Sequence, residues 1–149
     1  MGKGLNLKKD GEHVAFAAGT GALVYLDVVA RLIMQSANMS LEGIETFDPS
    51  FKFHFYVSFA TRKDAIGLEL CEALVKLNGE QGKDNFQLHV RISNEGGARW
   101  DADWIKKTVL GLGGANLKKV YVCGPPMMNE VFDKTLVETS LSPQQIDIT

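Results

Sequence analysis

Strand-like apolar runs alternate with helix-like apolar stripes along this chain. Short runs of β-branched and aromatic residues favour strands, whereas apolar residues spaced three and four positions apart favour amphipathic helices. The alternation is typical of βαβ units, in which each helix crosses over the sheet to the next parallel strand. We therefore expect an α/β fold, a doubly wound five-stranded parallel sheet with helices on both faces. The expected strands are residues 13–18, 53–60, 86–92, 119–123 and 145–148, of which the first, second and fourth look most buried.

Four apolar stripes with helical spacing lie between these runs. No Ser-rich, Pro-rich or low-complexity linker separates them, so we expect residues 1–149 to form a single domain. A domain of this length buries roughly 70% of the surface that its unfolded chain exposes, which is enough for a real core. The stripes expected to pack on the sheet are Leu23, Leu26, Val29, Ala30 and Ile33; Leu70, Ala73, Leu74 and Leu77; Trp104, Ile105, Thr108 and Val109; and Val131, Phe132, Thr135 and Leu136.

Charge and hydropathy exclude several classes of partner. A formal net charge of -2 lacks the excess of positive charge that is typical of nucleic-acid-binding domains. The longest apolar stretch, residues 22–34, is interrupted by Asp27 and Arg31 and is shorter than the roughly 20 residues that a membrane span needs, so we expect no membrane contact by this chain itself. The N-terminus lacks the apolar core of a secretory signal, and the two cysteines form no disulfide framework. We therefore expect a cytoplasmic setting, and the glycosylation pattern at residues 38–40 is interpreted as chance.

Gly19-Thr20-Gly21 falls between the first expected strand and the first expected helix. Glycines there let the backbone approach a phosphate closely, and the free amides and dipole of a helix N-terminus favour negative charge. The full dinucleotide fingerprint would need a third glycine where this chain has Val24, and the Gly-Lys-Ser/Thr ending of a P-loop is absent. Taken alone, the motif leaves a pyrophosphate loop and a plain tight turn both open.

The fourth expected strand ends abruptly in a cysteine, a glycine and two prolines. Pro125 and Pro126 cannot donate ladder hydrogen bonds, so the strand should end at Cys123 and place its thiol at the rim of the sheet. In open α/β sheets, ligands bind outside the carboxyl ends of the strands. A phosphatase loop would need an arginine where Asn129 stands, and a buried, inert thiol is the alternative to any role in a site.

A basic pair follows the second expected strand. In doubly wound folds this edge faces the adenosine ribose, where an acidic residue suits a free 2′-hydroxyl and a basic residue suits a 2′-phosphate. Arg62 and Lys63 precede Asp64, and a guanidinium offers a planar fork to a phosphate, so the arrangement favours NADPH over NADH. A solvated charged turn before a helix is the alternative interpretation.

Other residues with chemical potential lack the spacing of a site. The three histidines, His13, His54 and His89, share no metal-ligand pattern, so we expect no metal site and interpret them as core or edge residues. The indoles of Trp100 and Trp104 are interpreted as a packing face. The Gly-Leu-Gly-Gly sequence at residues 111–114 follows an expected helix, which favours helix termination over a nucleotide loop.

Taken together, the two strand-end motifs resemble those of a known family. Ala18-Gly19-Thr20-Gly21 and Cys123-Gly124-Pro125-Pro126-Met127-Met128 resemble the two diagnostic motifs of the NAD(P)H-binding domain of the ferredoxin-NADP reductase superfamily. The order of these motifs, with expected strands and helices between them, extends the resemblance over nearly the whole chain. Within the superfamily, the chain is most similar to the ferric reductase, NADPH oxidase and NAD(P)H-cytochrome or nitrate reductase branch. Residues 1–7 resemble the seam at the end of the flavin-binding barrel.

This resemblance implies a sheet order of 3-2-1-4-5 and a role in a flavin-dependent oxidoreductase. The chain would be the C-terminal half of that flavoprotein, with an FAD-binding domain in cis as its partner, and the parent protein could be bound to a membrane. It would position NADPH or NADH for hydride transfer to FAD, from which electrons pass to heme, iron or another acceptor. Alone, the chain would be inactive in electron transfer.

The resemblance also implies roles for individual residues. Gly19, Thr20 and Gly21 would hold the pyrophosphate and the nicotinamide-side ribose, while Ser58, Thr61 and Arg62 would flank the adenosine end. Cys123, the expected catalytic residue, would sit beside the nicotinamide carbon that gives up hydride and would position it rather than attack it. The walls around adenine and nicotinamide would be shaped by Gly124, Pro125, Pro126 and Met127.

Departures from the family pattern leave a second function open. The family usually has proline where this chain has Val24, and no aromatic residue follows Phe132, although many members end in an aromatic that covers the flavin. The Arg-x-Tyr/Phe-Ser/Thr flavin motif is absent, so FAD is expected to bind only the partner domain. The alternative function is a non-enzymatic regulatory or interaction domain that keeps the fold without productive nucleotide binding.

Overall fold

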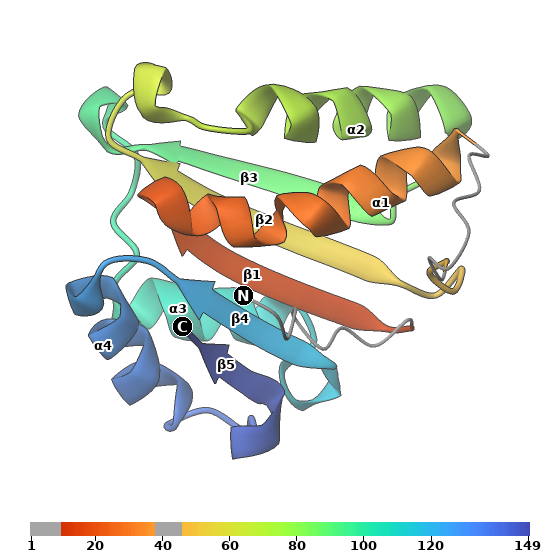
Figure 1. The fold of residues 1–149 in the computed structure, drawn as a ribbon. Helices are drawn as coiled ribbons and strands as arrows, with labels where there is room; N and C mark the ends of the chain where they lie inside the picture. The colour runs from red at the N-terminus through yellow and green to blue at the C-terminus, as the bar shows by residue number, and fades with distance from the viewer. Residues whose placement is uncertain (1–9, 38–45) are drawn as a thin grey trace.

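Residues 10–37 and 46–149 are described by the computed structural model. They contain a five-stranded parallel sheet with the strand order β3-β2-β1-β4-β5 (Figure 1). The strands are β1 (Glu12–Ala18), β2 (Lys52–Phe59), β3 (Phe86–Ile92), β4 (Lys119–Cys123) and β5 (Ile146–Ile148). The expected fold class and strand order are confirmed, and each expected strand agrees to within one residue at either end. The sequence features expected at residues 1–7 and 38–40 lie outside the described residues.

The central strands are buried on both faces, as their continuous apolar runs predict. In β1, Val14, Ala15, Phe16 and Ala17 are all 0% exposed, and the interiors of β2 and β4 are buried as well. A strand covered by helices on both sides has no solvent-facing positions, so its sequence loses the alternation of apolar and polar residues. The edge strands β3 and β5 are more exposed, which confirms the expected ranking.

Helices cover both faces of the sheet (Figure 1). On one face lie α1 (Leu26–Ser36) and α2 (Leu68–Gln81), and on the other lie α3 (Ala102–Gly111) and α4 (Pro126–Leu136). All four helices occur where the stripes predict them. The end of α3 at Gly111, followed by positive φ angles at Gly113 and Gly114, confirms helix termination at the glycine-rich segment.

The expected helical phase is wrong at some positions. Leu23, Leu70 and Val131 were expected to face the sheet, but they are 47%, 36% and 40% exposed. Leu23 lies in a 3-10 helix, η1 (Gly19–Tyr25), that precedes α1. A 3-10 helix has 3.0 residues per turn instead of 3.6, so it rotates the residues before α1 out of the phase that an α-helical pattern assumes.

Two apolar layers sandwich the sheet. The α1 and α2 side contains the phenylalanines of β2 together with Val28, Val29 and Leu32. On the α3 and α4 side, Phe16 packs against Phe132 with ring centroids 4.9 Å apart. The two indoles, Trp100 and Trp104, stack 5.2 Å apart, and both pack edge-on against Phe16, which confirms their interpretation as a packing face.

Because all five strands are parallel, their carboxyl ends share one edge of the sheet. The arrowheads in Figure 1 all point toward this edge, which we call the carboxyl edge. It carries the turns after β1, β2, β3 and β4, beginning at residues 19, 60, 93 and 124. Both strand-end motifs and the basic pair therefore belong to the same edge.

Candidate nucleotide-binding site

The two strand-end motifs meet at the carboxyl edge because β1 and β4 are neighbours. Ala17 pairs in register with Cys123, so the two strands end side by side. An ideal β-carbon built on Gly21 would overlap the carbonyl oxygen of Cys123 and would lie 2.8 Å from its carbonyl carbon and 3.2 Å from Sγ. Only a residue without a side chain fits at Gly21. Segments far apart in the sequence thus form one structural unit.

The first motif opens a helix directly. Gly19 has a φ of 58°, a left-handed conformation that favours glycine, and η1 starts at this residue. No side chain caps η1, and no acidic residue lies in its first turn. The first amides of a helix have no intrahelical acceptor, so those around Thr20 are donors available to an anion. η1 runs on into α1, which adds the dipole of a longer helix.

The second motif opens a second helix beside the first. Pro126 is the first residue of α4, where its fixed φ and missing N–H suit the helix start, and Pro125 occupies the N-cap. Here too, no side chain caps the helix and no acidic residue lies in the first turn. Each helix N-terminus carries about half a positive charge. Two uncapped N-termini at adjacent strand ends therefore favour a negatively charged group between them.

Gly124 lies against the methionine pair of the second motif. A β-carbon on Gly124 would be 2.6 Å from Sδ of Met128, a contact with the end of a flexible side chain that could be relieved by moving it. Met127 is 77% exposed, whereas Met128 packs against the core on the α3 and α4 side. An exposed methionine at the carboxyl edge is free to cover a ligand, whereas Met128 is held by its packing against the core.

The Cys123 thiol is half-buried at the end of β4. Burial raises the pKa of this thiol above its ordinary value of 9.0, so it carries its proton at neutral pH. A nucleophilic cysteine needs the opposite shift, which a nearby cation or an uncapped amide directed at the sulfur would supply. Cys123 is therefore suited to packing beside a ligand and not to attacking one.

The residues expected at the adenosine end already hold intramolecular partners. Ser58 is 7% exposed, and its hydroxyl accepts a hydrogen bond of 2.8 Å from Nη1 of Arg91. The Thr61 hydroxyl donates to Oδ2 of Asp64 at 2.9 Å. The Arg62 guanidinium pairs with the carboxylate of Glu95, with Nε 2.9 Å from Oε2 and Nη2 3.0 Å from Oε1.

Solved structures provide the comparison with known proteins. Flavohemoglobin from Malassezia yamatoensis aligns over 97% of this chain and 33% of its own at a TM-score of 0.64 and 19% identity. The cytochrome b5 reductase domain of Ulva prolifera nitrate reductase aligns over 94% of this chain and 49% of its own, with a TM-score of 0.63 and 16% identity. Ferredoxin-NADP+ reductase from Plasmodium falciparum aligns over 95% of this chain and 53% of its own, with a TM-score of 0.63 and 13% identity. The chain thus spans between a third and about half of these flavoproteins.

The chain has the fold of the ferredoxin reductase-like NAD(P)-binding domain. At identities below 20%, this likeness establishes the arrangement of the backbone and leaves the function to the residues themselves. No protein-family model matches the sequence, and no curated protein sequence matches it.

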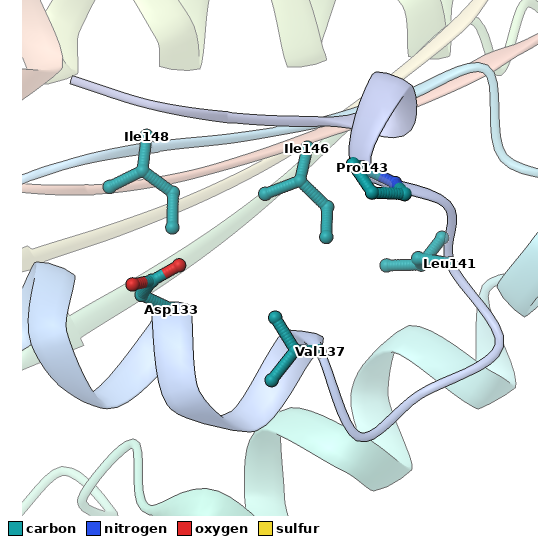
Figure 2. A pocket seen from close by; sticks show the side chains of 6 residues that line it. All are labelled: Asp133, Val137, Leu141, Pro143, Ile146 and Ile148. Carbon is teal, nitrogen blue, oxygen red and sulfur yellow. The ribbon is translucent and has the colours of Figure 1, made fainter.

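A cavity elsewhere on this fold does not coincide with the strand-end motifs. It lies between α4 and β5, has a volume of about 330 Å³, and is lined by Val137, Leu141, Pro143, Ile146 and Ile148, with Asp133 at one side (Figure 2). Aliphatic walls and a carboxylate offer no donors for a phosphate. In the described part of the chain, no three potential ligands gather as a metal site, and no helix is long and apolar enough to span a membrane.

Sequence reasoning missed one residue of the carboxyl edge. Glu95 lies in the turn η3 (Ser93–Glu95) after β3, where its carboxylate pairs with Arg62. The rule that ligands bind at the carboxyl ends of parallel strands applies to β3 as well as to β2. Applied to every strand, it would have drawn attention to Glu95 before the structure did.

Proposed function

We propose that this chain is the NAD(P)H-binding domain of a flavin-dependent oxidoreductase. The observation that carries the proposal is the order of groups along the carboxyl edge. Cys123 ends β4, Gly19 follows β1, and Arg62 follows β2, and these three strands are consecutive in the sheet. A dinucleotide laid along this edge would place nicotinamide, pyrophosphate and adenosine in that same order.

The described residues fit the chemistry of each part of the nucleotide. The uncapped amides at the start of η1 suit the pyrophosphate, because an anion takes up donors that the helix leaves unpaired. The Gly21 position keeps the chain close to Cys123, so the pyrophosphate and the nicotinamide would lie in adjacent places. The protonated Cys123 thiol would form one wall of the nicotinamide site without competing for the reaction.

The whole enzyme would need a second domain. NAD(P)H supplies a hydride, and the proposed partner is an FAD-binding domain in cis that accepts it. The roles of this chain are to bind the nucleotide and to orient the nicotinamide face toward that partner. Onward transfer to heme, iron or another acceptor belongs to the partner or to further proteins.

The departure at Val24 does not disturb the proposed site. Its side chain is 40% exposed in η1 and belongs to neither apolar layer. A residue facing solvent there changes the start of the helix little, so the amides of the first turn keep their direction.

A charge introduced at Thr20 tests the proposal directly. Thr20 is exposed in the first turn of η1, where a carboxylate would repel a pyrophosphate but would stabilise the helix through its dipole. We expect Thr20→Asp to weaken NADH and NADPH binding roughly tenfold, the effect of about 1.4 kcal/mol of repulsion between close charges. Thr20→Asn, which is equal in size and uncharged, is the matched control.

Binding is measured by NMR titration of the 149-residue chain with NADH and NADPH. Without the flavin partner, a dissociation constant near 1 mM is expected, which corresponds to about 4 kcal/mol of binding free energy. The amides of Gly19, Thr20, Gly21 and Cys123 should shift together. A wild-type chain that gives no response at millimolar nucleotide would overturn the proposal, as would equal binding by the Asp and Asn variants.

A further inference from the structure

We propose that Glu95 sets the preference between NADH and NADPH by holding the Arg62 guanidinium, and that it favours NADH. The inference rests on the proposed function and assigns a specificity residue within that site. The NADPH preference expected from Arg62 in the sequence takes no account of this carboxylate.

The contact between the two side chains uses the donors that a 2′-phosphate would need. Nε of Arg62 lies 2.9 Å from Oε2 of Glu95, and Nη2 donates to Oε1 at 3.0 Å. This is the two-pronged arrangement in which a guanidinium recognises either a carboxylate or a phosphate. A 2′-phosphate must therefore displace Glu95 or share Arg62 with it.

The backbone keeps Glu95 beside the end of β2. The amide of Asn94, the preceding residue, donates to the carbonyl oxygen of Ala60 at 3.0 Å and ties the turn after β3 to the turn after β2. The two turns lie side by side at the carboxyl edge (Figure 1). If a 2′-phosphate displaced Glu95 from Arg62, the Glu95 carboxylate would still lie near the bound phosphate.

In the turn after β2 the positive charges are balanced without a phosphate, and Arg91, which donates to the neighbouring Ser58 at 2.8 Å, is a further cation nearby. Arg62 and Lys63 are offset by Asp64, which accepts the hydrogen bond of Thr61, and by Glu95. A phosphate monoester adds a charge of about -1.5 to -2 at neutral pH. A free 2′-hydroxyl adds none and can donate a hydrogen bond to a carboxylate. The arrangement thus disfavours the phosphorylated nucleotide.

Glu95 can be replaced without threatening the fold. The Arg62 and Glu95 side chains are 68% and 48% exposed, and exposed ion pairs contribute little to stability. A comparable exposed pair joins Lys106 Nζ in α3 to Oε1 of Glu138, at 3.0 Å; Glu138 lies just beyond the C-terminal end of α4, away from the carboxyl edge. Glu138→Gln is therefore a matched control for Glu95→Gln.

The test compares the binding of NADPH and NADH by NMR titration of the whole chain. We expect Glu95→Gln to tighten NADPH binding roughly tenfold, because it frees the Arg62 guanidinium to pair with the 2′-phosphate, and to leave NADH binding within about twofold. Glu138→Gln should change neither affinity. Replacing Arg62 by Gln in the Glu95→Gln background should remove the gain, because the gain requires a free guanidinium.

The outcomes separate the two proposals. If wild type binds both nucleotides and Glu95→Gln leaves their ratio unchanged, Glu95 is not the specificity residue and the proposed function stands. A tenfold gain that persists without Arg62 would also overturn the inference. If neither nucleotide binds to wild type or to Glu95→Gln, both proposals fail together. Titration with adenosine 2′,5′-bisphosphate and with 5′-AMP, which differ only in the 2′-phosphate, repeats the comparison of affinities without the nicotinamide.

Discussion

The backbone of Gly21 lies against the carbonyl group of Cys123, leaving no room for a β-carbon between them. This contact joins the start of η1 to the end of β4 and brings the two strand-end motifs together. It also explains why a glycine is needed at Gly21, which has no positive φ angle and would otherwise accept other residues.

Gly21→Ala is expected to destabilise the chain. The new methyl group would have to displace the Cys123 backbone, and overpacking of this kind costs about 1 to 3 kcal/mol. Urea denaturation followed by circular dichroism measures the change in the free energy of unfolding. The control is Gly79→Ala in α2, where a β-carbon meets nothing within 4 Å and should stabilise the helix by up to about 1 kcal/mol. Equal stabilities for the two variants would contradict the close approach.

The Cys123 thiol is expected to react slowly with iodoacetamide at pH 7.5. Burial raises its pKa, so the thiolate fraction should be smaller than in free cysteine. The reaction is followed by mass spectrometry in a Cys71→Ala variant, in which Cys123 is the one remaining cysteine. Cys71 itself should react little, because it is buried and its pKa is raised to about 12. Added NADH should slow the alkylation further. A rate above that of free cysteine would identify an activated nucleophile and would contradict a positioning role.

Stability is expected to fall as the pH falls from 7 to 5, partly because of His54. Burial lowers the pKa of His54 below its ordinary 6.5, although the hydrogen bond to Glu12 at 3.1 Å acts in the opposite direction. The unfolded chain therefore takes up a proton at a higher pH than the folded chain, and stability is lost as the pH falls through about 6.5 toward the lowered folded pKa.

His54→Gln should flatten this profile in urea denaturation at several pH values. One titrating group contributes at most about 1.4 kcal/mol per pH unit. Partial burial also lowers the pKa of His89, with His54 as a further cause. His89 is exposed whereas His54 is buried, so His89→Gln should flatten the profile less. A His54→Gln profile as steep as that of wild type would show that this histidine does not carry the effect.

Arg91→Lys is expected to loosen the segment between β3 and α3. Nε of Arg91 donates to the carbonyl oxygen of Ala98 at 2.7 Å while Nη1 donates to the buried Ser58 hydroxyl. A single ammonium group cannot reproduce this fork, so the free energy of unfolding should fall by about 1 to 2 kcal/mol.

Hydrogen exchange should report the loosening of residues 93–101 in Arg91→Lys. Arg31→Lys is the comparison, because Arg31 pairs with Asp27 on the exposed surface of α1, where such pairs contribute a few tenths of a kcal/mol. If exchange in residues 93–101 were unchanged by Arg91→Lys, the bridge would not be holding this segment.

The sequence alone determined the layers of the fold. Continuous apolar runs marked β1, β2 and β4 because strands covered on both faces have no polar side. Glycine marked the end of β1 because it adopts φ angles that other residues avoid. Proline marked the end of β4 because it has no N–H to donate to the neighbouring strand. The sheet order and the motif residues came from the resemblance, and the structure agrees with the order.

Only the tertiary structure decided which side chains meet at the carboxyl edge. Glu95 reaches Arg62 because β3 lies beside β2, and Gly21 meets Cys123 because β4 lies beside β1. Local periodicity reports burial and secondary structure, but it carries no information on which distant turn adjoins which. The phase of the helix stripes failed for a related reason, since the 3-10 turns of η1 changed the rotation per residue before α1. The sequence determined the elements, and their order in the sheet determined the site.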